Sequence, residues 1–206
     1  MSNGKVTILC KWLLLLSLCI GVGCGDGSSK IQGQNVAGAG AVSGQRDSLY
    51  QFPQDFVGDW EGQITVYGAE GPRQTVRMEL LIQPITDSSY TYVIIYGEDR
   101  EAGRRDYVIK RGPDGPHHWV CDERNSILLD GYYIGGIYQS VFTVMGSTLV
   151  TNLEHRGDHL WMTFQSVATE PTRSTGDTIV EGEEIPVVES YRVKAINTVR
   201  LYPREG

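Results

Sequence analysis

Apolar and polar residues alternate with a period of two along most of the chain after residue 56, which is typical of half-buried β-strands. Residues 60–67 place Trp60, Ile64 and Val66 on one side of such a strand, and Glu61 and Thr65 on the other. Segments of this kind follow one another at spacings of about ten residues. The predicted strands are 60–67, 75–82, 90–96, 105–110, 118–122, 127–134, 137–145, 148–154, 160–165 and 188–201.

The gaps between these strands are short and rich in Gly, Pro, Asn and Asp, for example residues 68–72, 112–116 and 156–158. Short turns join antiparallel neighbours, and a sheet of about ten strands usually curls and closes. The pattern therefore predicts an all-β fold, an antiparallel up-and-down barrel of about ten strands. Residues 169–186 are too long for a simple hairpin turn, and we expect either a surface loop or a lid over the barrel mouth.

The N-terminus has the pattern of a targeting segment. Lys5 and Lys11 precede an apolar run from 12 to 22, which is too short to span a membrane but suits a secretory signal. Gly21-Val22-Gly23-Cys24 resembles a bacterial lipobox, although Gly21 stands where Leu is usual. This resemblance implies that Cys24 is lipidated and anchors the protein in the bacterial cell envelope, at the periplasmic face or the cell surface. The protein would be secreted if the lipobox is not used.

The domain prediction follows from this leader. Residues 1–23 form a lipoprotein signal peptide, residues 24–50 a flexible tether rich in Gly, Ser and Ala, and residues 51–206 the barrel domain. Cys10 and Cys19 leave with the signal, so Cys121 is the only cysteine of the domain and no disulfide is expected.

The formal charge is −7, and it becomes −9 without residues 1–23, because 16 basic and 25 acidic side chains remain. An acidic surface argues against nucleic acid and against docking on anionic lipid. We expect the protein to contact the membrane through its N-terminal lipid alone, and the sequence leaves its protein partners unknown.

Gly58-Asp59-Trp60, at the start of this meander, resembles the G-x-W signature of the calycin superfamily, which includes the lipocalins. The segments YTYVIIYGED, RDYVIK, CDERNSILLD and RGDHLWM are similar to a group of bacterial lipocalin-like lipoproteins of uncharacterised activity. The resemblance implies that Trp60 closes one end of the barrel and that Arg200, on the last strand, packs across it as a cation on an indole.

A barrel of this kind suggests a carrier. We expect binding of a small, largely apolar molecule, with the core or cavity lined by Trp60, Met78, Tyr92, Tyr96, Phe142, Met162, Phe164 and Tyr191. The alternative is a structural or interaction lipoprotein whose barrel is solid, because the same alternation fills a core without a ligand.

Other chemistry has weaker signals. Arg200-Leu201-Tyr202 matches the carboxylate-binding Arg-x-Tyr of fatty-acid-binding proteins, but strand parity turns both side chains outward unless a bulge lies near Asn197. His155 and His159 flank a turn on polar positions, and no His follows them, so we expect neither a metal site nor haem. A third reading is a hydrolase-type enzyme that uses Glu98 and Asp122, but nucleophile and phosphate-loop motifs are missing, and we expect no catalytic residues and no cofactor.

Overall fold

The computed structural model describes residues 50–204, and most of them lie in strands. The predicted signal peptide, most of the tether and Cys24 lie outside the described residues. The elements are η1 (Gln54–Phe56), β1 (Gly58–Gly68), β2 (Gly71–Ile82), β3 (Pro84–Thr86), β4 (Ser89–Tyr96), α2 (Arg100–Gly103), β5 (Arg104–Arg111), β6 (His118–Asp122), β7 (Leu128–Ile134), β8 (Ile137–Val144), β9 (Ser147–His155), β10 (Leu160–Thr175), β11 (Thr178–Val180), β12 (Glu183–Ile185) and β13 (Val188–Pro203).

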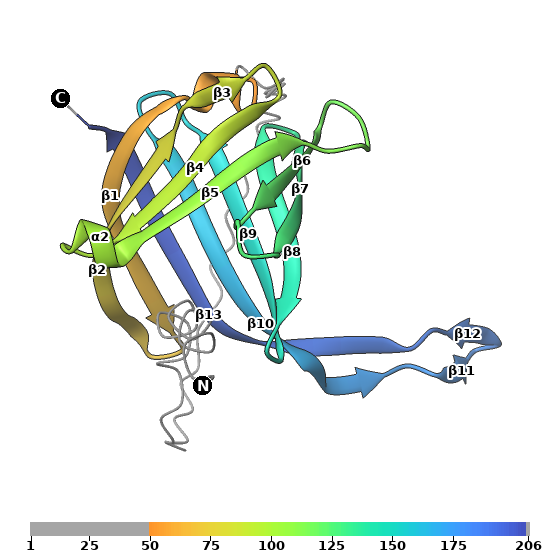
Figure 1. The fold of residues 1–206 in the computed structure, drawn as a ribbon. Coiled ribbons are helices and arrows are strands. Elements are labelled where there is room, and N and C mark those ends of the chain that lie inside the picture. Colours follow the sequence, from red (N-terminus) through yellow and green to blue (C-terminus); the bar gives the residue numbers. More distant parts are fainter. Residues whose placement is uncertain (1–49, 205–206) are drawn as a thin grey trace, which may run out of the picture. The chain divides into compact units, whose positions relative to one another are not determined.

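Ten of these strands form a closed antiparallel barrel (Figure 1). Neighbours in the sheet follow the order β2-β1-β13-β10-β9-β8-β7-β6-β5-β4, and a second pairing between β2 and β4 closes the ring. Neighbouring strands are joined directly by hairpin connections, except for the pairs β1–β13 and β2–β4. These connections are short, apart from the long one between β10 and β13. The predicted all-β, up-and-down barrel of about ten strands is therefore confirmed.

The period-two alternation decides which side chains face inward. Met78, Leu80 and Ile82 of β2 are fully buried inside the barrel, and β10 and β13 contribute further inward apolar side chains such as Leu160 and Leu201. Within residues 50–204 no helix is long and apolar enough to cross a membrane.

A buried carboxylate on the outer wall fastens two flanking segments to β2. Glu79 points away from the interior, yet its side chain is covered by three arginines. The nearest N–O distances are 2.9 Å to Arg77, 2.6 Å to Arg100 at the start of α2, and 2.9 Å to Arg204 near the chain end. The backbone N–H of Arg204 also donates to the Asp59 carbonyl at 2.8 Å, so Arg204 is fixed beside the start of β1.

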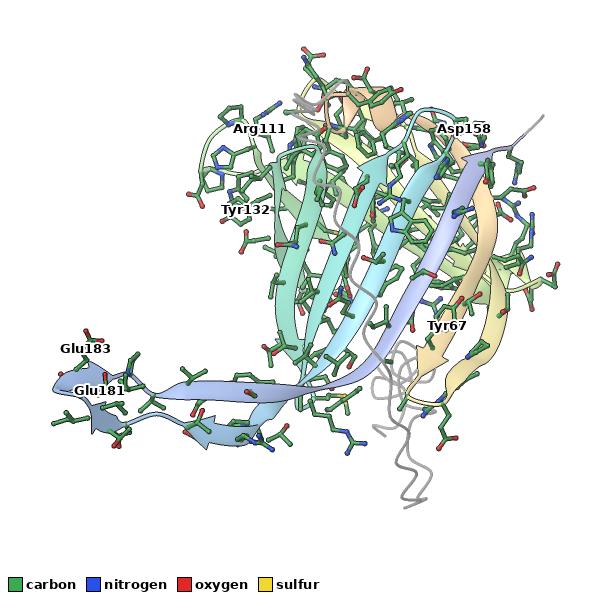
Figure 2. The ribbon with its side chains drawn as sticks, turned by 180° about the vertical axis from the view of Figure 1, so that it is seen from behind. Tyr67, Arg111, Tyr132, Asp158, Glu181 and Glu183 are labelled. Carbon is green, nitrogen blue, oxygen red and sulfur yellow. The ribbon has the colours of Figure 1, made fainter. Side chains whose placement is uncertain are left out.

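The segment 169–186 is neither a loop nor a lid. β10 and β13 continue beyond the barrel, pairing Pro171 with Tyr191 and Ser174 with Glu189, and β11 and β12 form the far part of this hairpin. Figure 1 shows the hairpin projecting away from the end of the barrel, and Figure 2 shows Glu181 and Glu183 at its tip. We call residues 169–193 the arm. The expectation of a lid failed because Thr, Ile and Val in this segment favour strand over loop.

Candidate ligand site inside the barrel

A short segment ahead of β1 closes the end of the barrel opposite the arm. We call residues 50–57 the plug. Its Phe52 is 4% exposed and its Phe56 fully buried, and η1 lies over the barrel end in Figure 1. Tyr50 stacks on His155 of β9 with ring centroids 3.8 Å apart, and its carbonyl accepts a hydrogen bond from the Tyr133 hydroxyl at 2.5 Å.

Trp60 holds this plug in place. Its indole Nε1 donates to the Phe56 carbonyl at 3.0 Å, and its ring meets His155 edge-on at 5.7 Å. Gly58 has a φ of +154°, and a Cβ there would come within 3.0 Å of the Trp60 Nε1. The glycine of the G-x-W motif therefore leaves room for the indole to turn back toward the plug.

Arg200 does not pack across Trp60, so the predicted closure pair is wrong. The Arg200 guanidinium lies 5.5 Å over the ring of Trp161, and Arg156 approaches the same ring at 5.0 Å. The reason is parity: the pairing of β13 with β1 and β10 is continuous through Asn197, without a bulge. Arg200 and Tyr202 consequently face outward, which also removes the Arg-x-Tyr carboxylate site.

A different pair brings a cation onto a tryptophan at the plug end. The Arg111 guanidinium of β5 lies 4.4 Å over the fully buried ring of Trp119 in β6, and it donates to the Pro116 carbonyl at 2.8 Å. Figure 2 places Arg111 at the end of the barrel opposite the arm. Arg111 and Trp119 are direct partners across the hairpin of β5 and β6. The sequence analysis missed them because it took the closing cation from the last strand, as the resemblance implied.

Phe52 occupies a box of aromatic rings at the centre of this end. Its ring stacks on Tyr138 of β8 at 4.2 Å with an interplanar angle of 10°. Trp119 meets it edge-on at 5.9 Å, and Tyr133 stacks more loosely at 5.8 Å. We call Trp119, Tyr133 and Tyr138 the aromatic box.

Two polar atoms of the aromatic box have no hydrogen-bond partner. In the described part of the chain, the buried side-chain polar atoms without a partner are Trp119 Nε1, the Tyr138 hydroxyl and Asn197 Oδ1. Buried polar groups in proteins are nearly always paired, and an unpaired one costs about 1–3 kcal/mol. Trp119 and Tyr138 thus offer two buried donors to an acceptor that the chain itself does not supply.

The surroundings of these donors favour neutral groups. Burial raises the pKa of the Tyr138 and Tyr92 hydroxyls above their usual range, and it raises the pKa of the Cys121 thiol to about 12. Each of the three also interacts electrostatically with another of them, so their polar atoms lie in one region of the interior. A ligand group without charge therefore suits this region better than an anion.

The predicted liners divide by position. Trp60, Met78, Tyr92, Met162 and Phe164 are buried on the inner face, while Tyr96 and Phe142 face inward and are half-buried. Tyr191 lies on the arm, is 44% exposed and donates to Glu189 at 2.6 Å, so its prediction as a liner is wrong. Alternation in the sequence predicts Tyr191 on the inward side, but the register of β13 against β10 shifts beyond Ala195, and the strand has left the barrel at Tyr191.

The side chains considered for other chemistry have ordinary partners. Lys110 binds Asp122 at 2.8 Å and lowers the pKa of that carboxyl, which is the opposite of what a general acid needs. His155 is not on a polar surface position: it stacks under Tyr50, and burial lowers its pKa. His159 binds Asp158 at 2.7 Å, and in residues 50–204 no three metal-binding side chains are grouped to hold an ion.

Comparisons with protein-family models, with curated proteins and with solved structures found no match for this chain.

Proposed function

We propose that this protein binds a small, largely apolar molecule inside its barrel, with Trp119 and Tyr138 as the hydrogen-bond donors. The observation that carries the proposal is the pair of unpartnered buried donors in a region lined mainly by aromatic rings. A ligand that brings an acceptor would remove the cost of leaving both donors unpaired, and this gain supplies selectivity as well as affinity.

The barrel also supports a proposal of kinship with the calycin superfamily. Gly58 and Trp60 stand at the start of the first strand of a closed meander, and the indole lies at a closed end. The cation that packs on a barrel-end tryptophan comes from Arg111, however, rather than from the last strand. Kinship rests on the motif and the closure, and a ligand type does not follow from it.

Envelope anchoring belongs to the same proposal. Gly21-Val22-Gly23-Cys24 supports lipidation of Cys24, which would place the barrel at a membrane surface. The test is membrane fractionation of the native protein and of Cys24→Ala expressed in the same host. We expect the variant to leave the membrane fraction; a variant that stays membrane-associated would contradict the anchor.

The ligand is tested with the protein purified from its own host. Native mass spectrometry, followed by extraction of any bound molecule, should show added mass that Tyr138→Phe reduces. Thermal unfolding with a panel of apolar compounds gives a second readout, because a ligand that binds only the folded state raises the melting temperature. If the protein carries no added mass and no compound raises its melting temperature, the binding proposal is refuted.

The arm favours a second candidate, an interaction lipoprotein with a filled barrel. It exposes apolar side chains, among them Ile179 at 73%, and residues 174–191 contain five acidic and no basic side chains. A partner with a basic surface would suit this composition. Crosslinking from residues at the arm tip, in the native host and at two salt concentrations, tests for such a partner.

A further inference from the structure

Phe52 occupies the place where the proposed function requires the ligand. Its ring lies against Tyr138 and Trp119, the two residues whose donors are unpartnered. A phenyl ring fits the aromatic surroundings, but it carries no acceptor for a hydroxyl or an indole N–H. Phe52 thus fills the aromatic box but leaves the Trp119 N–H and the Tyr138 hydroxyl without a hydrogen-bond partner.

The plug is held in a way that permits it to leave. Its backbone hydrogen bonds from Asp55 to Gln51 and from Phe56 to Pro53 are local, and it pairs with no strand of the barrel. It is held by ring contacts and by hydrogen bonds from Trp60 to the Phe56 carbonyl and from Tyr133 to the Tyr50 carbonyl. Movement of residues 50–57 would break these contacts without opening the barrel's hydrogen-bonded ladder.

We propose that Phe52 is an internal stand-in for the ligand, and that the ligand is a flat aromatic molecule with a neutral acceptor, such as a ketone carbonyl. This inference rests on the proposed function. The ligand's ring takes the position of the Phe52 ring against Tyr138, and its carbonyl oxygen accepts from the Tyr138 hydroxyl and the Trp119 N–H. The plug swings out as the ligand enters, so Phe52 competes with the ligand for the aromatic box.

The ligand's acceptor should be neutral, because the cation in contact with the aromatic box is already engaged elsewhere. Arg111 is the guanidinium in contact with Trp119, but it covers the indole face and donates to the Pro116 carbonyl. The unpartnered donors belong to a phenol and an indole, and both are uncharged. A carboxylate would leave its charge unbalanced beside them, whereas a ketone would not.

Three probes of similar shape test the ligand class: 2-acetylnaphthalene with a carbonyl, 2-ethylnaphthalene without an acceptor, and 2-naphthoate with a charge. Their dissociation constants are measured by calorimetry on the full chain. We expect 2-acetylnaphthalene to bind tightest. Tyr138→Phe should reduce its advantage over 2-ethylnaphthalene by about fivefold, the effect of one neutral hydrogen bond.

The stand-in role is tested by Phe52→Ala, with Phe56→Leu as the matched control in the same segment. Removing the competing ring should tighten 2-acetylnaphthalene about tenfold or more, because the closed box no longer has to be emptied first. Phe56→Leu keeps the Phe52 ring and should change binding less. Near-UV circular dichroism checks folding, and Phe52→Leu replaces the alanine variant if that variant does not fold.

The outcomes separate the two proposals. If the wild type binds 2-acetylnaphthalene and the Phe52 variant binds it no tighter, the stand-in role is wrong and the proposed function survives. If native mass spectrometry finds a bound molecule but none of the probes binds, the ligand class is wrong. If the purified protein carries nothing and no probe binds any variant, the proposed function itself fails.

Discussion

Gly131 lies directly beneath the ring of Tyr138. A Cβ built on Gly131 would fall 2.5 Å from the Tyr138 hydroxyl oxygen and 2.6 Å from its Cζ, well inside van der Waals contact. Gly131 pairs with Trp119 on one side and with Ser140 on the other. The missing side chain on β7 is therefore what lets the Tyr138 phenol lie flat toward the strand that carries Trp119.

Gly131→Ala should displace the Tyr138 ring and lower the free energy of unfolding by about 1–3 kcal/mol, the usual cost of overpacking. Urea unfolding measures the loss. The same substitution in a Tyr138→Leu background should cost less, because the smaller side chain can move aside. Equal costs in the two backgrounds would show that Gly131 does not act through Tyr138.

Trp60 and Arg200 should differ sharply in their effect on stability. Trp60→Ala removes a buried ring and the hydrogen bond to Phe56, and should lower the free energy of unfolding by about 3–5 kcal/mol. Arg200→Ala removes an exposed cation over Trp161 and should cost about 1 kcal/mol or less. A Trp60→Ala protein as stable as the wild type would contradict the role given to β1.

Alkaline pH should destabilise the fold through Cys121. Burial raises the pKa of its thiol from 9.0 to about 12, so between these values the unfolded chain releases a proton that the folded chain keeps. The free energy of unfolding therefore falls as pH rises through this window, and the buried hydroxyls of Tyr92 and Tyr138 act in the same direction.

Urea unfolding of the wild type and of Cys121→Ala, below pH 9 and again within the window, measures this effect. The slope with pH should be smaller in the variant. A thiol reagent at neutral pH should label Cys121 only as fast as the barrel opens. Immediate labelling of Cys121 in the folded protein, located by peptide mass mapping, would rule out the burial on which the prediction depends.

The outer part of the arm, residues 176–187, should be dispensable for the barrel. Thr175 and Val188 pair directly, so residues 176–187 can be replaced by Asn-Gly, a two-residue turn suited to a hairpin. Because residues 176–184 are exposed, we expect the free energy of unfolding to change by less than about 1 kcal/mol. A loss of several kcal/mol would mean that the arm supports the barrel.

The alternation of the sequence was sufficient to predict the barrel, since each of the ten predicted strands overlaps one of its ten strands. Parity even placed Arg200 and Tyr202 outward, against the resemblance that paired Arg200 with Trp60. The sequence analysis failed for Tyr191, because the alternating pattern continues beyond the part of β13 that belongs to the barrel. Simple alternation places Tyr191 inward, but the register between β10 and β13 shifts beyond Ala195, where β13 leaves the ring. No local signal in the sequence marks these shifts.

The aromatic box could not be predicted in this way. Phe52 and Phe56 precede the first strand, in a stretch without periodicity, and their partners come from β6, β7, β8 and β9. The two aromatic residues four positions apart, just before the Gly58-Asp59-Trp60 motif, were the available signal. Their contacts are set by how the closed barrel presents its rim, which is a property of the whole fold.

The plug is also the part of the described chain that precedes β1, next in sequence to residues 1–49. A force applied from the N-terminal side would act on Tyr50 and Phe52 before it reached any barrel strand. Ring stacking against Tyr138 resists such a load far less than the strand ladder does. Tension on the N-terminal side would thus open the closed end of the barrel before it separated any strand.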